Sequence, residues 1–65
     1  MTEIKIGDRV EFNHGQGKLR GVVVELRQKG EATQAVICVT AGTASDTARG
    51  REYVRNVHFC RLVAA

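Results

Sequence analysis

The stretch that decides the fold is NHGQGKLRGVVVEL, residues Asn13–Leu26. It holds three glycines and a Gly-Lys pair, and it ends in a valine run at Val22–Val24. Valine is branched at Cβ, which disfavours helix and suits a pleated sheet. The glycines before the run therefore form either a phosphate-binding loop or the turn between two strands.

The phosphate-binding loop does not fit the residues. Such a loop has the pattern G-x-x-x-x-G-K-[ST] and leads into a helix whose N-terminus faces the phosphate. Gly17 and Lys18 match its end, but Phe12 stands at the first glycine position and Leu19 at the hydroxyl position. No helical pattern follows, so the turn interpretation is preferred.

The turn interpretation gives each glycine a role. Gly15 and Gly17 allow positive φ where the chain reverses. Gly21 interrupts the second strand, where a bulge or a close backbone crossing is expected. A small barrel needs a bend of this kind in order to close.

Short strands separated by polar turns are predicted along the chain, and no segment has a sustained helical period. Strands are expected over Arg9–His14, Lys18–Leu26, Gln34–Thr40, Arg51–Val57 and Cys60–Val63. A polar turn is expected over Arg27–Thr33, a loop over Ala41–Gly50 and a tight turn over Val57–Phe59.

The length of 65 residues predicts one domain, 1–65. Five short strands are too few for two full sheets, so a small, bent barrel is expected. Closure into a bent barrel would remove most of the exposed strand edge. The prediction is an all-β, five-stranded SH3-like barrel, with an OB-like barrel as the alternative. The expected core is Val10, Phe12, Val23, Leu26, Val36, Cys38, Phe59 and Leu62.

The order of residues 6–26 resembles a KOW motif, which begins SH3-like barrels in transcription elongation factors and several ribosomal proteins. The matching segments are IGDRVEF, the glycine turn with Lys18, and GVVVEL. The motif positions fall on Gly7, Asp8, Val10, Gly21, Val23 and Leu26. The resemblance implies the barrel fold and contacts with RNA or the ribosome, although the turn has Gly-Lys in place of the usual Lys-Gly.

A second resemblance is to the plasmid-borne type II dihydrofolate reductases, short SH3-like chains with a GDRV strand that assemble as tetramers around a pore. Their pore-lining Val-Gln-Ile-Tyr segment would lie in the fourth strand, where this chain reads EYVRNV. The residues that hold folate and cofactor are therefore not present, and the resemblance does not imply that activity.

The net charge of +3 is unevenly distributed, with four arginines against one glutamate over residues 49–61. A basic stretch suits a polyanionic partner, and a solvated surface is the alternative. Arg51, Tyr53 and Arg55 alternate, so they are expected to share one strand face on which two guanidiniums flank a ring. Packing of Tyr53 at the barrel rim is the other interpretation. The predicted nucleic-acid contacts are Lys18, Arg20, Arg27, Lys29, Arg49, Arg51, Tyr53 and Arg55.

Catalytic and metal chemistry find little support in the sequence. The four possible ligands His14, Cys38, His58 and Cys60 lack the paired spacing of a zinc site, and neither thiol is marked as activated. The carboxylates stand singly, so no acid–base pair can be identified. No metal, cofactor or enzymatic activity is therefore expected.

The location and function follow as expectations. The N-terminal residues MTEIKIGDR have no apolar signal core, and no apolar run is long enough for a membrane span. A cytoplasmic chain with reduced cysteines is expected. The predicted function is a non-enzymatic binding module for nucleic acid or a nucleoprotein complex. The alternative is a protein-interaction or assembly module, including a homo-oligomer, because so small a domain has a marginal core.

Overall fold

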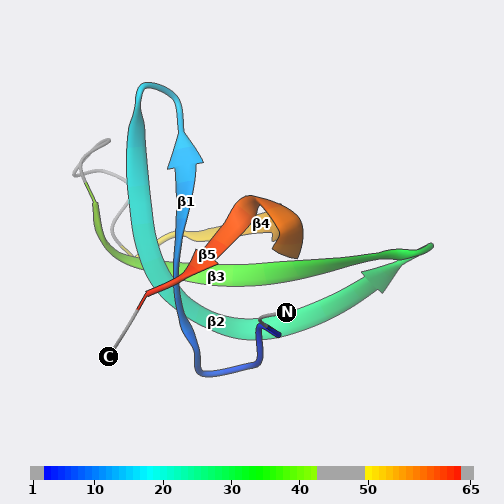
Figure 1. The fold of residues 1–65 in the computed structure, drawn as a ribbon. Coiled ribbons are helices and arrows are strands. Elements are labelled where there is room, and N and C mark those ends of the chain that lie inside the picture. Colours follow the sequence, from blue (N-terminus) through cyan, green and yellow to red (C-terminus); the bar gives the residue numbers. More distant parts are fainter. Residues whose placement is uncertain (1–2, 43–49, 64–65) are drawn as a thin grey trace.

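The computed structural model describes residues 3–42 and 50–63, and it is all-β, as predicted. Five antiparallel strands form one sheet in the order β4-β3-β2-β1-β5 (Figure 1). The elements are β1 (Arg9–His14), β2 (Gly17–Lys29), β3 (Ala32–Gly42), β4 (Glu52–Asn56), the 3-10 turn η2 (Val57–Phe59) and β5 (Cys60–Leu62).

The sheet is strongly curled, but closure into a barrel is not detected. β4 and β5 lie at its two edges, and no pairing within the described ranges joins them. The curl nevertheless carries β4 back towards β1, so that Arg55 Nη2 lies 3.2 Å from His14 Nδ1. The first and fourth strands thus meet through side chains.

The β2–β3 hairpin is longer than the sequence predicted. Pairing continues to Lys29 and Ala32, and only Gly30 and Glu31 form the turn, with Gly30 at φ 61°. The expected polar turn is therefore mostly strand, and it projects from the sheet as an arm (Figure 1). A cross-strand hydrogen bond from Thr33 Oγ1 to Gln28 Oε1, 3.0 Å long, links the two exposed strands.

Two irregularities interrupt the β2–β3 ladder, and their shifts of the pairing register cancel. Thr40 is an extra residue on β3 opposite the step from Arg20 to Gly21, and Val24 is an extra residue on β2. Each such bulge bends its strand and increases the local twist. Because one extra residue lies on each strand, the pairing near the arm has the same register as the pairing near Arg20.

The predicted glycine roles hold in part. Gly15 has a positive φ of 60°, as expected for the β1–β2 turn, but Gly17 begins β2 and is not among the glycines with positive φ. Gly21 lies at the expected close crossing: a Cβ built there would be 2.3 Å from the carbonyl oxygen of Cys38. A glycine is therefore required at position 21 because there is no room for a Cβ, and not because the backbone has a positive φ.

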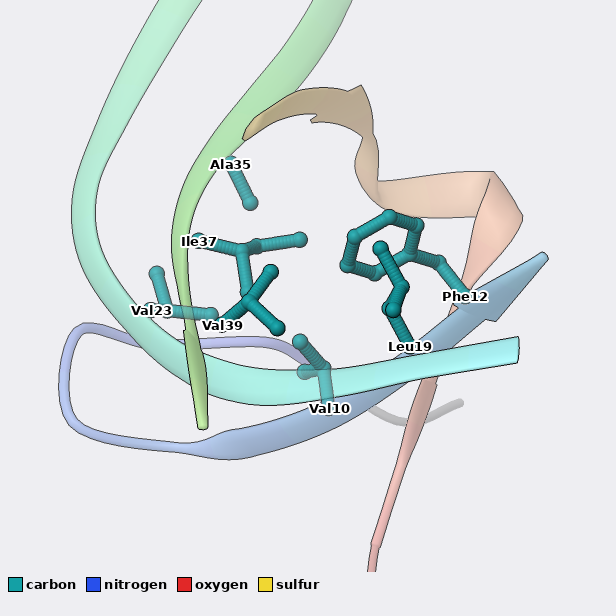
Figure 2. Close-up of a cluster of buried hydrophobic side chains, with 7 residues drawn as sticks. All are labelled: Val10, Phe12, Leu19, Val23, Ala35, Ile37 and Val39. Carbon is teal, nitrogen blue, oxygen red and sulfur yellow. The ribbon is translucent and has the colours of Figure 1, made fainter. Parts of the chain in front are cut away.

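The core lies inside the curl of β1, β2 and β3 (Figure 2). The predictions for Val10, Phe12 and Val23 are confirmed, and Leu26 and Leu62 pack against the central cluster. The cluster comprises Val10, Phe12, Leu19, Val23, Ala35, Ile37 and Val39.

Two predictions for the core need correction. On β3 the cluster uses Ala35, Ile37 and Val39, so strand alternation places Val36 and Cys38 on the opposite face. Val36 is nevertheless buried there, as predicted, so the corrections concern Cys38, which is only partly buried, and Phe59. Phe59 was expected in the core and is 74% exposed, because it lies in η2, where the chain leaves the strand geometry.

Candidate nucleic-acid interface

Four basic side chains lie on the outer face of β5, β1 and β2. Glu11 on β1 pairs with Arg20 on β2 and with Arg61 on β5, and directly opposed residues project to the same side of a sheet. Arg9 is two residues before Glu11, and Lys18 is two residues before Arg20, so alternation brings them to the same side. We call Arg9, Lys18, Arg20 and Arg61 the basic face.

Glu11 lies among these cations. Arg20 donates a hydrogen bond from Nε to Glu11 Oε2 at 2.8 Å, and Lys18 Nζ is 3.8 Å from Oε1. The hydrogen bond from Arg20, together with the charges of Arg20, Lys18 and Arg61, lowers the pKa of Glu11. The Glu11 side chain is only 13% exposed, whereas those of Lys18 and Arg20 are more than half exposed. The cations therefore present their charge to solvent above a carboxylate that stays ionised.

The basic face carries the positive excess of the chain. Four cations around one carboxylate leave an excess of three charges, which equals the net charge of the whole protein. In the part of the chain that the structure describes, no hydrogen bond or ion pair engages the side chains of Arg9 or Arg61. The other Lys, Arg, Asp and Glu residues balance one another in number.

The structure brings only part of the predicted contact set together. Lys18 and Arg20 share the basic face, whereas Arg27 and Lys29 lie on the β2–β3 arm. Arg27 is also paired there, with its Nε 2.6 Å from Glu25 Oε2. Arg49 lies outside the described residues.

Arg51, Tyr53 and Arg55, which were predicted to share one face, differ in their exposure to solvent. Arg51 is exposed just before β4, but Tyr53 is half-buried and packs against the core cluster, as the rim interpretation expected. The Arg55 guanidinium lies 5.4 Å from the centroid of the Tyr53 ring and 5.3 Å from that of Phe12. Tyr53 and Arg55 thus serve packing between β4 and β1.

The sequence interpretation missed Arg9 and Arg61. For Arg61 the sequence carries one signal, its place in the basic stretch 49–61, and for Arg9 it carries only the strand alternation of residues 9–14. Their approach to Arg20 depends on the pairing of β1 with β5, which joins the first strand to the last. Spacing along the chain does not reveal such a contact.

The two histidines and two cysteines do not come together in one site. His14 contacts Arg55 and packs edge-on against Tyr53, with ring centroids 5.0 Å apart. The Cys60 thiol lies 3.6 Å from the carbonyl oxygen of Asn56, and burial raises its pKa. Within residues 3–42 and 50–63 no three His, Cys, Asp or Glu side chains are grouped so that they could hold a metal ion.

None of the helical segments in these ranges has the length and apolar character of a membrane span.

Comparison with known proteins identifies no relative: no protein-family model, no curated protein and no solved structure matches the chain. The resemblance to a KOW motif therefore rests on residues 6–26 alone. What the structure supports is the coarser description, a small antiparallel sheet of five strands.

Proposed function

We propose that this protein is a non-enzymatic binding module that contacts the phosphate backbone of nucleic acid through the basic face. The observation that carries the proposal is the gathering of four exposed cations around a single carboxylate on one side of the sheet. Phosphate contacts of this type hold a nucleic acid in position without reading its sequence.

Strand pairing fixes the backbone positions from which the side chains of the basic face project. Arg9, Arg20 and Arg61 come from three neighbouring strands, whose spacing of about 4.8 Å fixes the separation of their Cα atoms. A polyanion that runs across these strands meets several cations at once and releases several counterions. A single small anion releases few, so the arrangement favours a polymer of phosphates.

We further propose that the curled sheet is an SH3-like barrel, left open between β4 and β5. Three features support this: the strand order, the contact of Arg55 with His14 across the curl, and the 3-10 turn between the last two strands. An experimental structure in which β4 lies far from β1 would contradict it.

The test of the nucleic-acid function compares two double variants with the same loss of charge. Arg9→Ala with Arg61→Ala removes two cations from the basic face, and Arg27→Ala with Lys29→Ala removes two from the arm. A labelled oligonucleotide is titrated at several salt concentrations. The first pair should reduce the slope of log K against log salt by about two, and the second pair should leave it nearly unchanged.

Two results would refute the proposal. One is absence of binding by the wild-type protein at low salt. The other is an equal reduction of slope in both double variants, which would mean that only net charge matters.

Self-association is a second candidate function, and exposed apolar side chains beside an open strand edge favour it. Val54 on β4 is 39% exposed, and Val24 at the β2 bulge is 43% exposed. β4 pairs only with β3 among the described strands, and an unpaired edge can add the same strand of a second copy. Sedimentation of the wild type and of Val54→Lys tests this: a dimer that the substitution dissociates supports it.

A further inference from the structure

Phe59 is the most exposed large apolar side chain in the described part of the protein, at 74%. The backbone that carries it is nevertheless ordered. Phe59 ends η2, where the Asn56 side chain accepts a hydrogen bond from the His58 backbone N–H at 2.9 Å and the Cys60 N–H bonds back to Val57. An aromatic ring is therefore held in solvent by an ordered turn.

A shallow hollow opens beside this ring. It is lined by Phe12, Asn13, Arg55, His58 and Phe59. The Arg55 guanidinium is steadied over the Phe12 ring, 5.3 Å from its centroid, and by its contact with His14. Phe12 itself is only 2% exposed, so Phe59 supplies the accessible phenyl ring of the hollow, beside a cation and Asn13.

The hollow adjoins the basic face. On β5, Arg61 pairs with Glu11 and Cys60 with Phe12, and the pairing ends there. Asn13 and Phe59, the next residue on each side, line the same hollow. Asn13 in turn pairs with Lys18. The cations of the basic face therefore continue to the edge of the hollow.

We infer that this hollow receives one unpaired base of a single-stranded nucleic acid, stacked on Phe59, while the adjoining phosphates lie on the basic face. The inference rests on the proposed nucleic-acid function and names its ligand more closely. An exposed ring among cations is the arrangement on which single strands stack their bases. Bases inside a duplex are already stacked and cannot reach such a ring.

The polar groups around the hollow match the edge of a base. The Asn13 amide offers both donors and an acceptor, and the His58 ring offers a donor or an acceptor according to its tautomer. Arg55 lies at the side of the hollow, where its charge favours the electron-rich face of a stacked base.

The absence of tryptophan from the chain allows a direct test. In Phe59→Trp the new indole is the single tryptophan, and a base stacked on it should quench its fluorescence. The probes are a short oligothymidylate, an abasic oligomer of equal length, and a duplex. Quenching by oligothymidylate alone is expected, while anisotropy of end-labelled probes reports binding to all three.

Phe59→Ala provides the affinity measurement. Loss of one stacked base should weaken binding of oligothymidylate between about fivefold and a hundredfold. Binding of the abasic oligomer and the salt slope should not change, because the phosphate contacts remain. The matched control is Ile6→Ala, which shortens another exposed apolar side chain, 64% exposed, and should change neither.

The outcomes separate this inference from the proposal beneath it. If no probe binds, the nucleic-acid function itself fails. If all probes bind with a salt slope that depends on the basic face, the nucleic-acid function stands. The stacking site is nevertheless refuted if the fluorescence of Phe59→Trp is not quenched and Phe59→Ala binds oligothymidylate as tightly as the wild type does. A melting curve of Phe59→Ala that matches the wild type excludes misfolding as the cause of a loss.

Discussion

The guanidinium of Arg55 lies over the ring of Phe12, 5.3 Å from its centroid, so a residue of the edge strand β4 packs on a core residue of β1. Arg55 also contacts the Tyr53 ring and His14. The contacts with Phe12 and His14 join β4 to β1, two strands that are not neighbours in the sheet. The curl of the sheet therefore depends in part on one arginine.

Arg55→Ala should lower the free energy of unfolding by about 1–2 kcal/mol, since each cation–π contact contributes about 0.5–1 kcal/mol at a site of this exposure. Arg51→Ala removes the same charge from an exposed position and should change it by less than about 0.5 kcal/mol. Urea unfolding followed by circular dichroism measures both. Equal effects would show that Arg55 contributes only its charge.

Gly21→Ala should destabilise the protein by about 1–3 kcal/mol, because the added Cβ would lie 2.3 Å from the Cys38 carbonyl oxygen and 2.7 Å from Ile37 Cγ2. β2 and β3 would have to separate at this point. The control is Gly15→Asn, in open space at a positive φ that asparagine tolerates, and it should be nearly neutral. If thermal melting gives the two variants the same midpoint, the close approach at Gly21 has no energetic consequence.

Stability should fall with acidification as Glu11 is protonated. The pKa of Glu11 is lowered in the folded protein from its ordinary value of 4.5. Ionised Glu11 therefore stabilises the fold fully above about pH 4.5, and this contribution is lost as the pH falls through the lowered pKa. Glu11→Gln lacks this contribution at every pH. Unfolding curves of the two proteins should therefore differ at neutral pH and converge well below pH 4.5.

The same substitution should strengthen binding of a polyanion at neutral pH, because it removes the carboxylate that lies among the cations of the basic face. Glu25→Gln, on the arm, is the control and should have little effect. Oligonucleotide titration at one salt concentration is sufficient. Weaker binding by Glu11→Gln would indicate that Glu11 positions Arg20, and that its charge is secondary.

Cys60 should react slowly with iodoacetamide in the folded protein. Burial raises its thiol pKa above the ordinary value of 9.0, so little thiolate is present at neutral pH. In Cys38→Ala, where Cys60 is the remaining cysteine, the alkylation rate should rise on unfolding in urea. A rate equal in folded and unfolded protein would mean that the thiol is as accessible as in a free chain.

The sequence identifies the strands better than it identifies their faces. The alternation of Val10 and Phe12 with polar residues places β1 correctly, because only one side of that strand is apolar. On β3 both alternating sets are apolar, so Ile37 and Cys38 are equally plausible core residues by pattern. Tertiary packing decides between them, and the bulges in the β2–β3 ladder complicate the choice.

For the candidate site, the sequence reveals the residues that are neighbours along the chain but not those that the fold brings together. Lys18 and Arg20 were recognised because they adjoin the glycine turn, a local feature. Arg61 joins them only through the pairing of β5 with β1, and Arg55 lies apart from them because the curl turns it towards Phe12. Phe59 was placed in the core because the sequence offers few large apolar residues, and no local signal marks the ring as exposed.

The two opposed bulges, Thr40 on β3 and Val24 on β2, have a consequence for how this chain can vary in length. Each is a residue that the ladder does not need for pairing, so a single deletion at either position can be absorbed by a return to regular pairing. The strand ends then keep their partners, and the basic face keeps its arrangement. Variants of this protein that differ by one residue within the long hairpin are therefore expected to fold, with the gap at one of these two positions.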